Sequence, residues 1–118
     1  MALTGKATES GAASYIDNVT PTTIITNSQG ANLILRLDKL ILKNVNAATR
    51  TYTLYKVPSG GSISGDDWKI VEGVTLDAEG HEDVREVAGL ILENGDSLRA
   101  LASAASSVRF DLSYWAES

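Results

Sequence analysis

Several stretches of the chain alternate apolar and polar residues with a period of two, the pattern of a half-buried strand. The clearest lies near the end of the chain and has four apolar positions, Val108, Phe110, Leu112 and Tyr114. Residues 51–57 are β-branched and aromatic, and they stop at Pro58. Further strands are predicted at 22–26, at 68–72 and 74–76 around Gly73, and in the apolar run 87–92.

The leucines of residues 33–43 change parity in the middle of the segment. They occupy odd positions before Asp38 and even positions after it. A strand that keeps its core face across this change must gain one residue, so we predict a β-bulge near Asp38–Lys39. The alternative is a helix over 33–43, because leucine is a good helix former.

Residues 98–105 are compatible with two structures. Asp96 could cap a helix that starts at Ser97. The same residues also form a strand pattern, with Leu98, Ala100 and Ala102 on one face, followed by a Ser/Ala turn. Local sequence leaves helix and strand both open.

The number and spacing of these segments predict the fold class. About seven to eight strands at close spacing, with no long helical pattern, are typical of an all-β protein built as a single antiparallel β-sandwich or jelly roll. We assign the sandwich domain to residues 15–118. Residues 1–14 are small and polar, so we expect an extended N-terminal arm that is ordered by another chain; the alternative is a first strand of the protein's own sheet.

Composition narrows the possible chemistry. The 118 residues carry 10 Lys+Arg and 15 Asp+Glu, a net charge of −5, with no cysteine and one histidine. Disulfides, cysteine zinc sites and two-histidine metal sites within one chain are therefore excluded. The acidic balance argues against nucleic-acid binding. The apolar runs are too short for a membrane span and the first residues are not a signal peptide, so we expect synthesis in a cytoplasm and no membrane partner.

The search for catalytic residues finds no convincing set. His81 lies in a polar stretch, 78–83, that we interpret as a solvated loop. The carboxylate pairs Asp66–Asp67 and Glu82–Asp83 lack the spacing of a calcium loop. No nucleophile elbow, phosphate loop or dinucleotide motif is present. We expect a protein that is not an enzyme and needs no metal or cofactor.

The aromatic residues are better candidates for function. Trp115 falls on the polar face of the last strand, and Trp68 follows a Gly/Ser/Asp segment. Exposed Trp and Tyr are preferred at the centres of protein interfaces. Trp68 has an alternative role, which is to cap the core. The expected partner-binding residues are Leu3, Tyr15, Tyr55, Trp68 and Trp115.

The C-terminal region, ENGDSLRALASAASSVRFDLSY (93–114), resembles small virion proteins of tailed bacteriophages. In that family a Gly-Asp pair precedes a short apolar strand, an Ala-Ser-Ala-Ala turn and an alternating strand. Residues 42–45 followed by 51–55 are similar to the family's central hairpin, and the start MALTG also fits. The resemblance covers most of 22–115 with motifs of low information, and it favours strand-turn-strand over helix for 98–105.

The resemblance implies a β-sandwich subunit of a phage particle without catalytic residues. We therefore expect a non-enzymatic virion protein that decorates the capsid or belongs to the head–tail connection. Its partners would be other virion proteins, such as major capsid, neck or tail subunits, and further copies of itself in a homo-oligomer. The alternative function is a carbohydrate-binding adhesion module in which Tyr55, Trp68 and Trp115 stack on sugar rings. That alternative requires Trp68 and Trp115 to share one exposed face.

Overall fold

The computed structural model describes residues 3–10, 15–27, 33–61 and 68–117. These residues form nine strands and one short 3-10 helix, η1. Their bounds are β1 Leu3–Ser10, β2 Thr22–Thr26, β3 Ile34–Asn44, β4 Arg50–Val57, β5 Lys69–Leu76, β6 His81–Asp83, η1 Arg85–Val87, β7 Ile91–Leu92, β8 Ser97–Ala102 and β9 Val108–Glu117.

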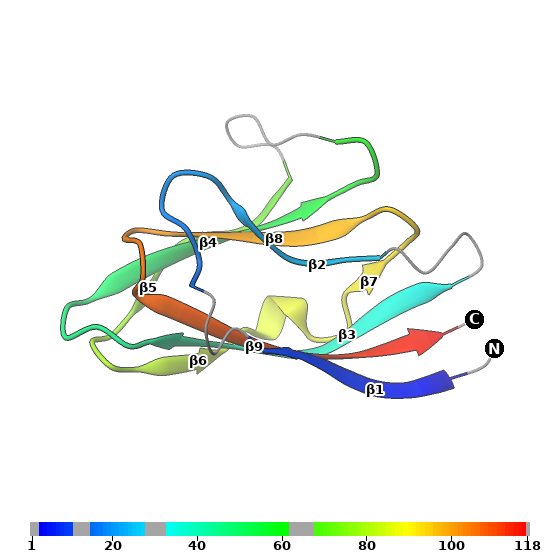
Figure 1. The fold of residues 1–118 in the computed structure, drawn as a ribbon, viewed down its shortest axis with the longest axis horizontal. Helices are drawn as coiled ribbons and strands as arrows, with labels where there is room; N and C mark the ends of the chain where they lie inside the picture. Colours follow the sequence, from blue (N-terminus) through cyan, green and yellow to red (C-terminus); the bar gives the residue numbers. More distant parts are fainter. Residues whose placement is uncertain (1–2, 11–14, 28–32, 62–67, 118) are drawn as a thin grey trace.

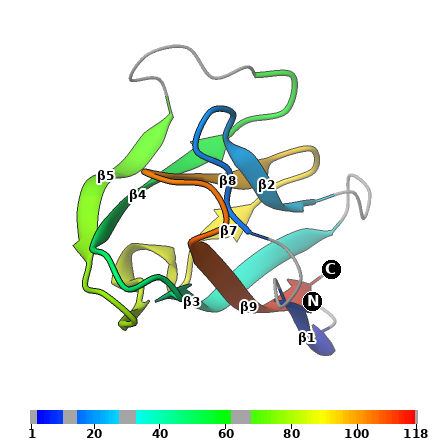
Figure 2. The same ribbon diagram turned by 60° about the vertical axis from the view of Figure 1, so that its left-hand side comes forward.

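The strands build two antiparallel sheets that pack face to face (Figures 1 and 2). Sheet A has the order β1-β9-β3-β6, with β7 also paired to β3, and sheet B has the order β2-β8-β4-β5. The first strand pairs with the last, β2 with β8, β3 with β6, and β4 with β5. This nested pairing is that of a jelly roll. The expected all-β sandwich or jelly roll is confirmed, with the two-residue β7 bringing the strand number to nine.

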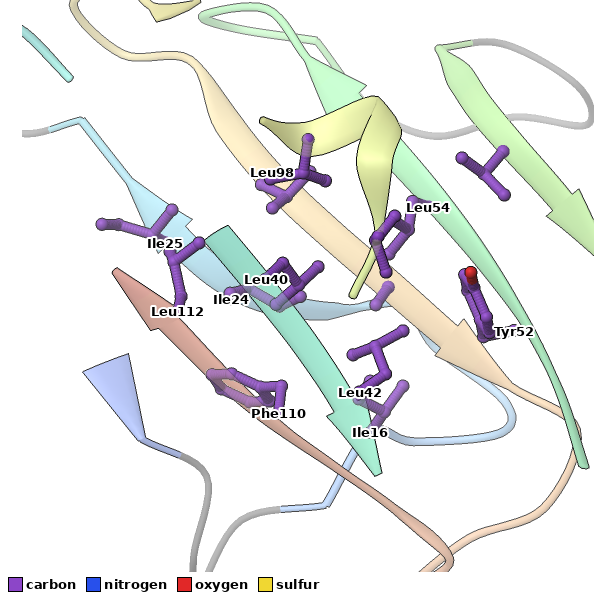
Figure 3. Close-up of a cluster of buried hydrophobic side chains, with 14 of the residues drawn as sticks. Ile16, Ile24, Ile25, Leu40, Leu42, Tyr52, Leu54, Leu98, Phe110 and Leu112 are labelled. Atoms are coloured by element: carbon purple, nitrogen blue, oxygen red, sulfur yellow. The ribbon is translucent and has the colours of Figure 1, made fainter. Parts of the chain in front are cut away.

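The core lies between the two sheets. Leucines of β3 and the apolar residues of β9 face those of β4 and β8, and η1 lies between the layers (Figures 1 and 3). Burial of these side chains is the main stabilising term of a sandwich of this size. Fully buried members include Leu35, Leu37, Leu40, Leu42, Leu54, Leu98 and Leu112.

The parity change in β3 is a bulge, as predicted. Leu37 pairs with Tyr114 and Lys39 with Ser113, so Asp38 is the extra residue. Leucines on both sides of it are buried, which is the reason for the insertion. The Asp38 carboxylate accepts a hydrogen bond from the Ser113 hydroxyl at 2.9 Å. The helix considered for 33–43 is not formed.

Residues 97–102 form the strand β8, followed by a turn that leads into β9. The structure thus confirms strand-turn-strand, the alternative that the resemblance to phage proteins favoured for 98–105. Local helix propensity is overridden because β8 pairs on both sides, with β2 and with β4. Leu98, Ala100 and Ala102 face the core, as the strand pattern required.

Two of the predicted segments differ from the structure. The run 87–92 was predicted as a strand, but only Ile91–Leu92 pairs; η1 and Gly89, at φ +82°, precede it. Main-chain hydrogen bonds from Gly89 to Leu37 and from Leu37 to Leu90, both 2.8 Å, hold that turn. His81 was predicted in a loop, but His81–Asp83 forms β6, because residues 41–43, near the end of β3, are free to pair with it.

The region around Gly73 forms one strand. β5 runs through Gly73, which takes φ +59°, and the ladder with β4 is irregular beside it. Trp68 stays outside the strand and directly precedes it. The prediction of one or two strands here resolves to one.

The N-terminal segment includes a strand of the protein's own sheet. Leu3–Ser10 pairs antiparallel with β9 and forms one edge of sheet A. This is the alternative to an arm ordered by another chain; residues 1–2 and 11–14 lie outside the described residues. Whether a second chain also contacts this segment stays a prediction.

Two buried asparagines tie loops to the ends of β3. The Asn27 side-chain amide donates to the carbonyls of Leu33 at 3.0 Å and Leu92 at 2.9 Å. The Asn44 amide donates to Ala48 at 2.8 Å and Asp77 at 3.1 Å, and its oxygen accepts from the Asn46 N–H at 3.0 Å. Both asparagines are 0% exposed, so these bonds replace the bonds that water cannot make to the buried side-chain amides.

Asn44→Ala should lower the free energy of unfolding by about 1–3 kcal/mol, because it leaves part-buried carbonyls and an N–H without partners. Asn46→Ala is the matched control: its side chain accepts one exposed hydrogen bond from the Ala48 N–H at 3.0 Å and should cost less than about 1 kcal/mol. Urea unfolding measures both. Equal losses in the two variants would show that the buried amide is not what holds this end.

Candidate interaction surfaces

Trp115 lies on the outer face of sheet A. In β9, the side chains of Val108, Phe110 and Leu112 are buried in the core, and a period of two turns Trp115 the other way. Its partners in the ladder are Arg36 of β3 and Lys6 of β1. Trp115 is half-buried, flanked by a strand on each side. Figures 1 and 2 show no described element covering this face.

Tyr15 is held against the same face by its own chain. The Ile16 N–H donates to the Val108 carbonyl at 2.9 Å, which fixes the segment beside the start of β9. The Tyr15 hydroxyl accepts a hydrogen bond from Arg109 Nη2 at 2.8 Å, and Arg109 Cζ lies 5.1 Å from the centre of the Tyr15 ring. A cation at this distance is attracted by the ring. Tyr15 therefore positions Arg109 and is itself half-buried.

Tyr55 does not offer a free surface. It lies on the outer face of sheet B with Thr51 and Thr53, as the sequence pattern predicts, but it is only 4% exposed. A residue buried to this extent in its own chain has almost no area left for a partner. Its place among the expected interface residues is corrected on this ground; alternation identifies the face of a residue but not what covers it.

Trp68 is the most exposed aromatic side chain among the described residues, at 43%. It precedes β5, the outer strand of sheet B, and its carbonyl accepts the Lys56 N–H at 2.9 Å. Its φ of +67° is left-handed, a conformation that costs a bulky residue about 1–2 kcal/mol. The alternative role, a cap on the core, does not fit this exposure.

Trp68 and Trp115 lie on opposite layers of the sandwich. Trp115 belongs to sheet A, whereas Trp68 adjoins the outer strand of sheet B. The two rings therefore do not form the common platform that the carbohydrate-binding alternative required. Leu3, the remaining predicted contact residue, lies at the start of β1 opposite Glu117.

A cavity that the sequence did not indicate opens between the two sheets. Its volume is about 200 Å³, and it lies between β5 on one side and β6 with η1 on the other. Glu82 points inward because its ladder partner, Leu42, faces the core. Its carboxylate accepts a hydrogen bond from the Tyr52 hydroxyl. The lining residues are Tyr52, Val74, Glu82, Asp83, Arg85 and Glu86.

The Tyr52 phenol is held in its neutral form. Burial raises the pKa of Tyr52 well above its usual value, and the hydrogen bond to Glu82 and the negative charges of Glu82 and Glu86 raise it further. A tyrosine that keeps its proton acts as a hydrogen-bond donor. Tyr52 thus links sheet B to β6 at the edge of the core, where Figure 3 shows its hydroxyl.

The described residues contain no cluster of metal ligands. Within the described ranges, no three His, Cys, Asp or Glu side chains are grouped so that they could hold a metal ion. His81 is exposed on β6 opposite Lys43, and Asp66–Asp67 lies outside the described residues. In the part of the chain that the structure describes, no helix is long and apolar enough to cross a membrane.

No family model, curated protein or solved structure matches the chain. The exposed features of the two sheets are therefore the basis for a functional assignment.

Tyr52→Phe should lower the free energy of unfolding at pH 7 by about 1.5–3 kcal/mol, the worth of a hydrogen bond to a charged group. An unfolded tyrosine ionises near pH 10. Folded Tyr52 keeps its proton to higher pH, so above about pH 10 the unfolded state binds fewer protons and stability falls as pH rises. Tyr52→Phe has no phenol proton to lose at this position, so its free energy of unfolding does not fall in this way. The difference in free energy of unfolding between the wild type and Tyr52→Phe should therefore shrink above that pH.

Urea unfolding at a series of pH values measures this effect. Tyr114→Phe is the control, because the Tyr114 hydroxyl has no hydrogen-bond partner among the described residues. A deficit of Tyr52→Phe that stays constant from neutral to alkaline pH would contradict the assignment of Tyr52 as the neutral donor.

Proposed function

We propose that this chain is a non-enzymatic structural subunit of a bacteriophage particle that binds neighbouring virion subunits, as a capsid decoration protein or as a head–tail component. It is made in the host cytoplasm and functions in the virion. Its partners are major capsid, neck or tail subunits and further copies of itself. The mechanism is burial of surface against these neighbours, with many copies adding avidity.

The observation that carries this proposal is the outer face of sheet A. No strand or helix of the described residues covers this face, and the half-buried Trp115 lies in the ladder between the positions of Arg36 and Lys6. Tryptophan contributes a large contact area with few rotors and is enriched at binding hot spots. A rigid sheet presents such a residue at a fixed place, which suits a subunit that must dock at many equivalent sites.

Three further points support the proposal. The motifs of 42–55 and 93–114 resemble those of small virion proteins of tailed phages. The jelly roll is an architecture that viral capsid domains use, although lectins and cupins use it as well, so this second point is an analogy of fold alone. Trp115 belongs to sheet A whereas Trp68 only adjoins sheet B, which favours this proposal over a carbohydrate-binding module that needs both rings on one face.

Trp115→Ala should leave the domain folded and weaken attachment to the particle tenfold or more, since truncation of a central interface tryptophan costs at least about 2 kcal/mol of binding. Phe110→Ala is the matched core variant. Phe110 is 7% exposed in the same strand, and its truncation should cost about 3–5 kcal/mol of folding stability.

Circular dichroism melts give the stability of both variants, and co-sedimentation with particles that lack the protein gives the attachment. If Trp115→Ala unfolds the domain as severely as Phe110→Ala, Trp115 is a core residue. If Trp115→Ala attaches like the wild type, or if the wild type does not attach, the proposal loses its support.

A further inference from the structure

Residues on the outer face of sheet A form two adjacent rows that run across the strands, one with mainly basic and the other with mainly acidic side chains. The register of the ladders places His81 of β6, Lys43 of β3 and Arg109 of β9 side by side. We call these three residues the basic row. The second row lies two residues further along the same strands and consists of Asp83, Ile41 and Asp111; we call it the acidic row.

The two rows have matching spacings. Neighbouring members of a row are about 4.8 Å apart, the distance between strands, and the rows are about 6.8 Å apart, the rise of two residues. Each row has its outer members on β6 and β9 and its central member on β3. A copy of one row would therefore fit over the other.

The charges of the rows are poorly neutralised within the chain. Among the described residues, neither Lys43 nor Asp111 has an ion-pair partner. Asp83 contacts Lys39 at 3.7 Å, and both side chains are about half exposed, so this pair is weak. Lys43 and Arg109 stand directly opposite each other, an arrangement that destabilises a sheet.

Arg109 is also held in place by its own chain, although not all of its hydrogen-bond donors have a partner. Its Nη2 donates to the Tyr15 hydroxyl at 2.8 Å, but its Nε is buried and has no hydrogen-bond partner. The guanidinium is thus positioned by its own chain while part of its donor capacity stays unused. A carboxylate of another chain cannot reach the buried Nε and can bind only the other nitrogens of the guanidinium.

We propose that a second copy of this chain docks on the outer face of sheet A, related to the first by a two-fold axis that runs parallel to the rows and between them. This rotation places the basic row of each copy over the acidic row of the other. His81 then meets Asp83 of the second copy, and Arg109 meets Asp111 of the second copy. The Lys43 stem covers Ile41 of the second copy, as lysine stems do on apolar surface.

Charge complementarity is the argument for this occupant. The chain has a net charge of −5, so two copies repel each other unless their contact aligns opposite charges. The two-fold axis makes every contact twice, which is the isologous pattern of most dimers. Because the contact is small and polar, the dimer belongs to the weak class of interfaces. Its association should therefore be measured at protein concentrations up to the upper micromolar range. The inference does not rest on the virion assignment.

A charge swap tests the arrangement. In a dimer of Asp111→Lys, the introduced lysine of one copy would lie against Arg109 of the other copy. In a dimer of Arg109→Glu, the introduced glutamate of one copy would lie against Asp111 of the other. Both contacts are repulsive, so neither variant should dimerise alone. In a one-to-one mixture, Arg109 of one chain meets Asp111 of the other, and the introduced lysine meets the introduced glutamate. The mixture should therefore regain the dimer.

Sedimentation velocity over a concentration series gives the dissociation constants. We expect a dimer for the wild type, at least tenfold weaker association for each single variant, and recovery in the mixture. Glu72→Lys makes the same change of net charge as Asp111→Lys, on exposed Glu72 of sheet B, and should dimerise like the wild type. Trp115→Ala should also keep the dimer, because Trp115 lies outside both rows, so this test is independent of particle attachment.

A second pair of variants covers the case in which Arg109→Glu fails to fold without its Tyr15 contact. His81→Glu and Asp83→Lys change exposed residues of β6 and should behave in the same way, separately and mixed. Circular dichroism establishes that each variant is folded. A monomeric wild type, a fully dimeric Asp111→Lys, or mixtures of folded variants that stay monomeric would each overturn the proposal.

Discussion

The structure depends on the pairing of β3 with β9. These two long strands form the middle of sheet A, and the other strands of that sheet pair with one of them. Their inner faces bring Leu40 and Leu42 alongside Phe110 and Leu112 in the core (Figure 3). Since β3 and β9 are far apart in the sequence, the pairing requires a long loop closure that burial of these side chains must offset.

The bulge at Asp38 allows this pairing to serve two purposes. It keeps the leucines of β3 on the core face along the whole strand, and it leaves Arg36, Lys39 and Lys43 on the opposite face together with two isoleucines. The outer face of sheet A is therefore a consequence of how the core is built. Trp115 and the two rows occupy positions on it that are set by the ladder register, so a partner meets them in a fixed geometry.

The ends of the sandwich are fastened by polar contacts. Asn27 and Asn44 bind main-chain carbonyls at the two ends of β3, and Tyr52 with Glu82 joins sheet B to β6. Buried polar groups that are fully paired add rigidity and specify one arrangement. A scaffold closed in this way suits a protein whose proposed role is to present surfaces to neighbours.

The sequence by itself determined the local features. Runs of β-branched and aromatic residues predicted the strands of 22–26 and 51–57. Period-two alternation predicted the strand of 108–114 and placed Trp115 away from the core, and the parity change predicted the bulge. These features depend on neighbouring residues only, because the period of a strand fixes which side each residue faces.

The tertiary structure alone decided which strands meet and what covers each face. It made 97–102 a strand, ended the predicted strand of 87–92 at a 3-10 turn, buried Tyr55, and separated Trp68 from Trp115. It also aligned His81, Lys43 and Arg109, which lie on three strands far apart in the chain. Local pattern could not give these results, because pairing and burial are set by non-local contacts that alternation does not encode.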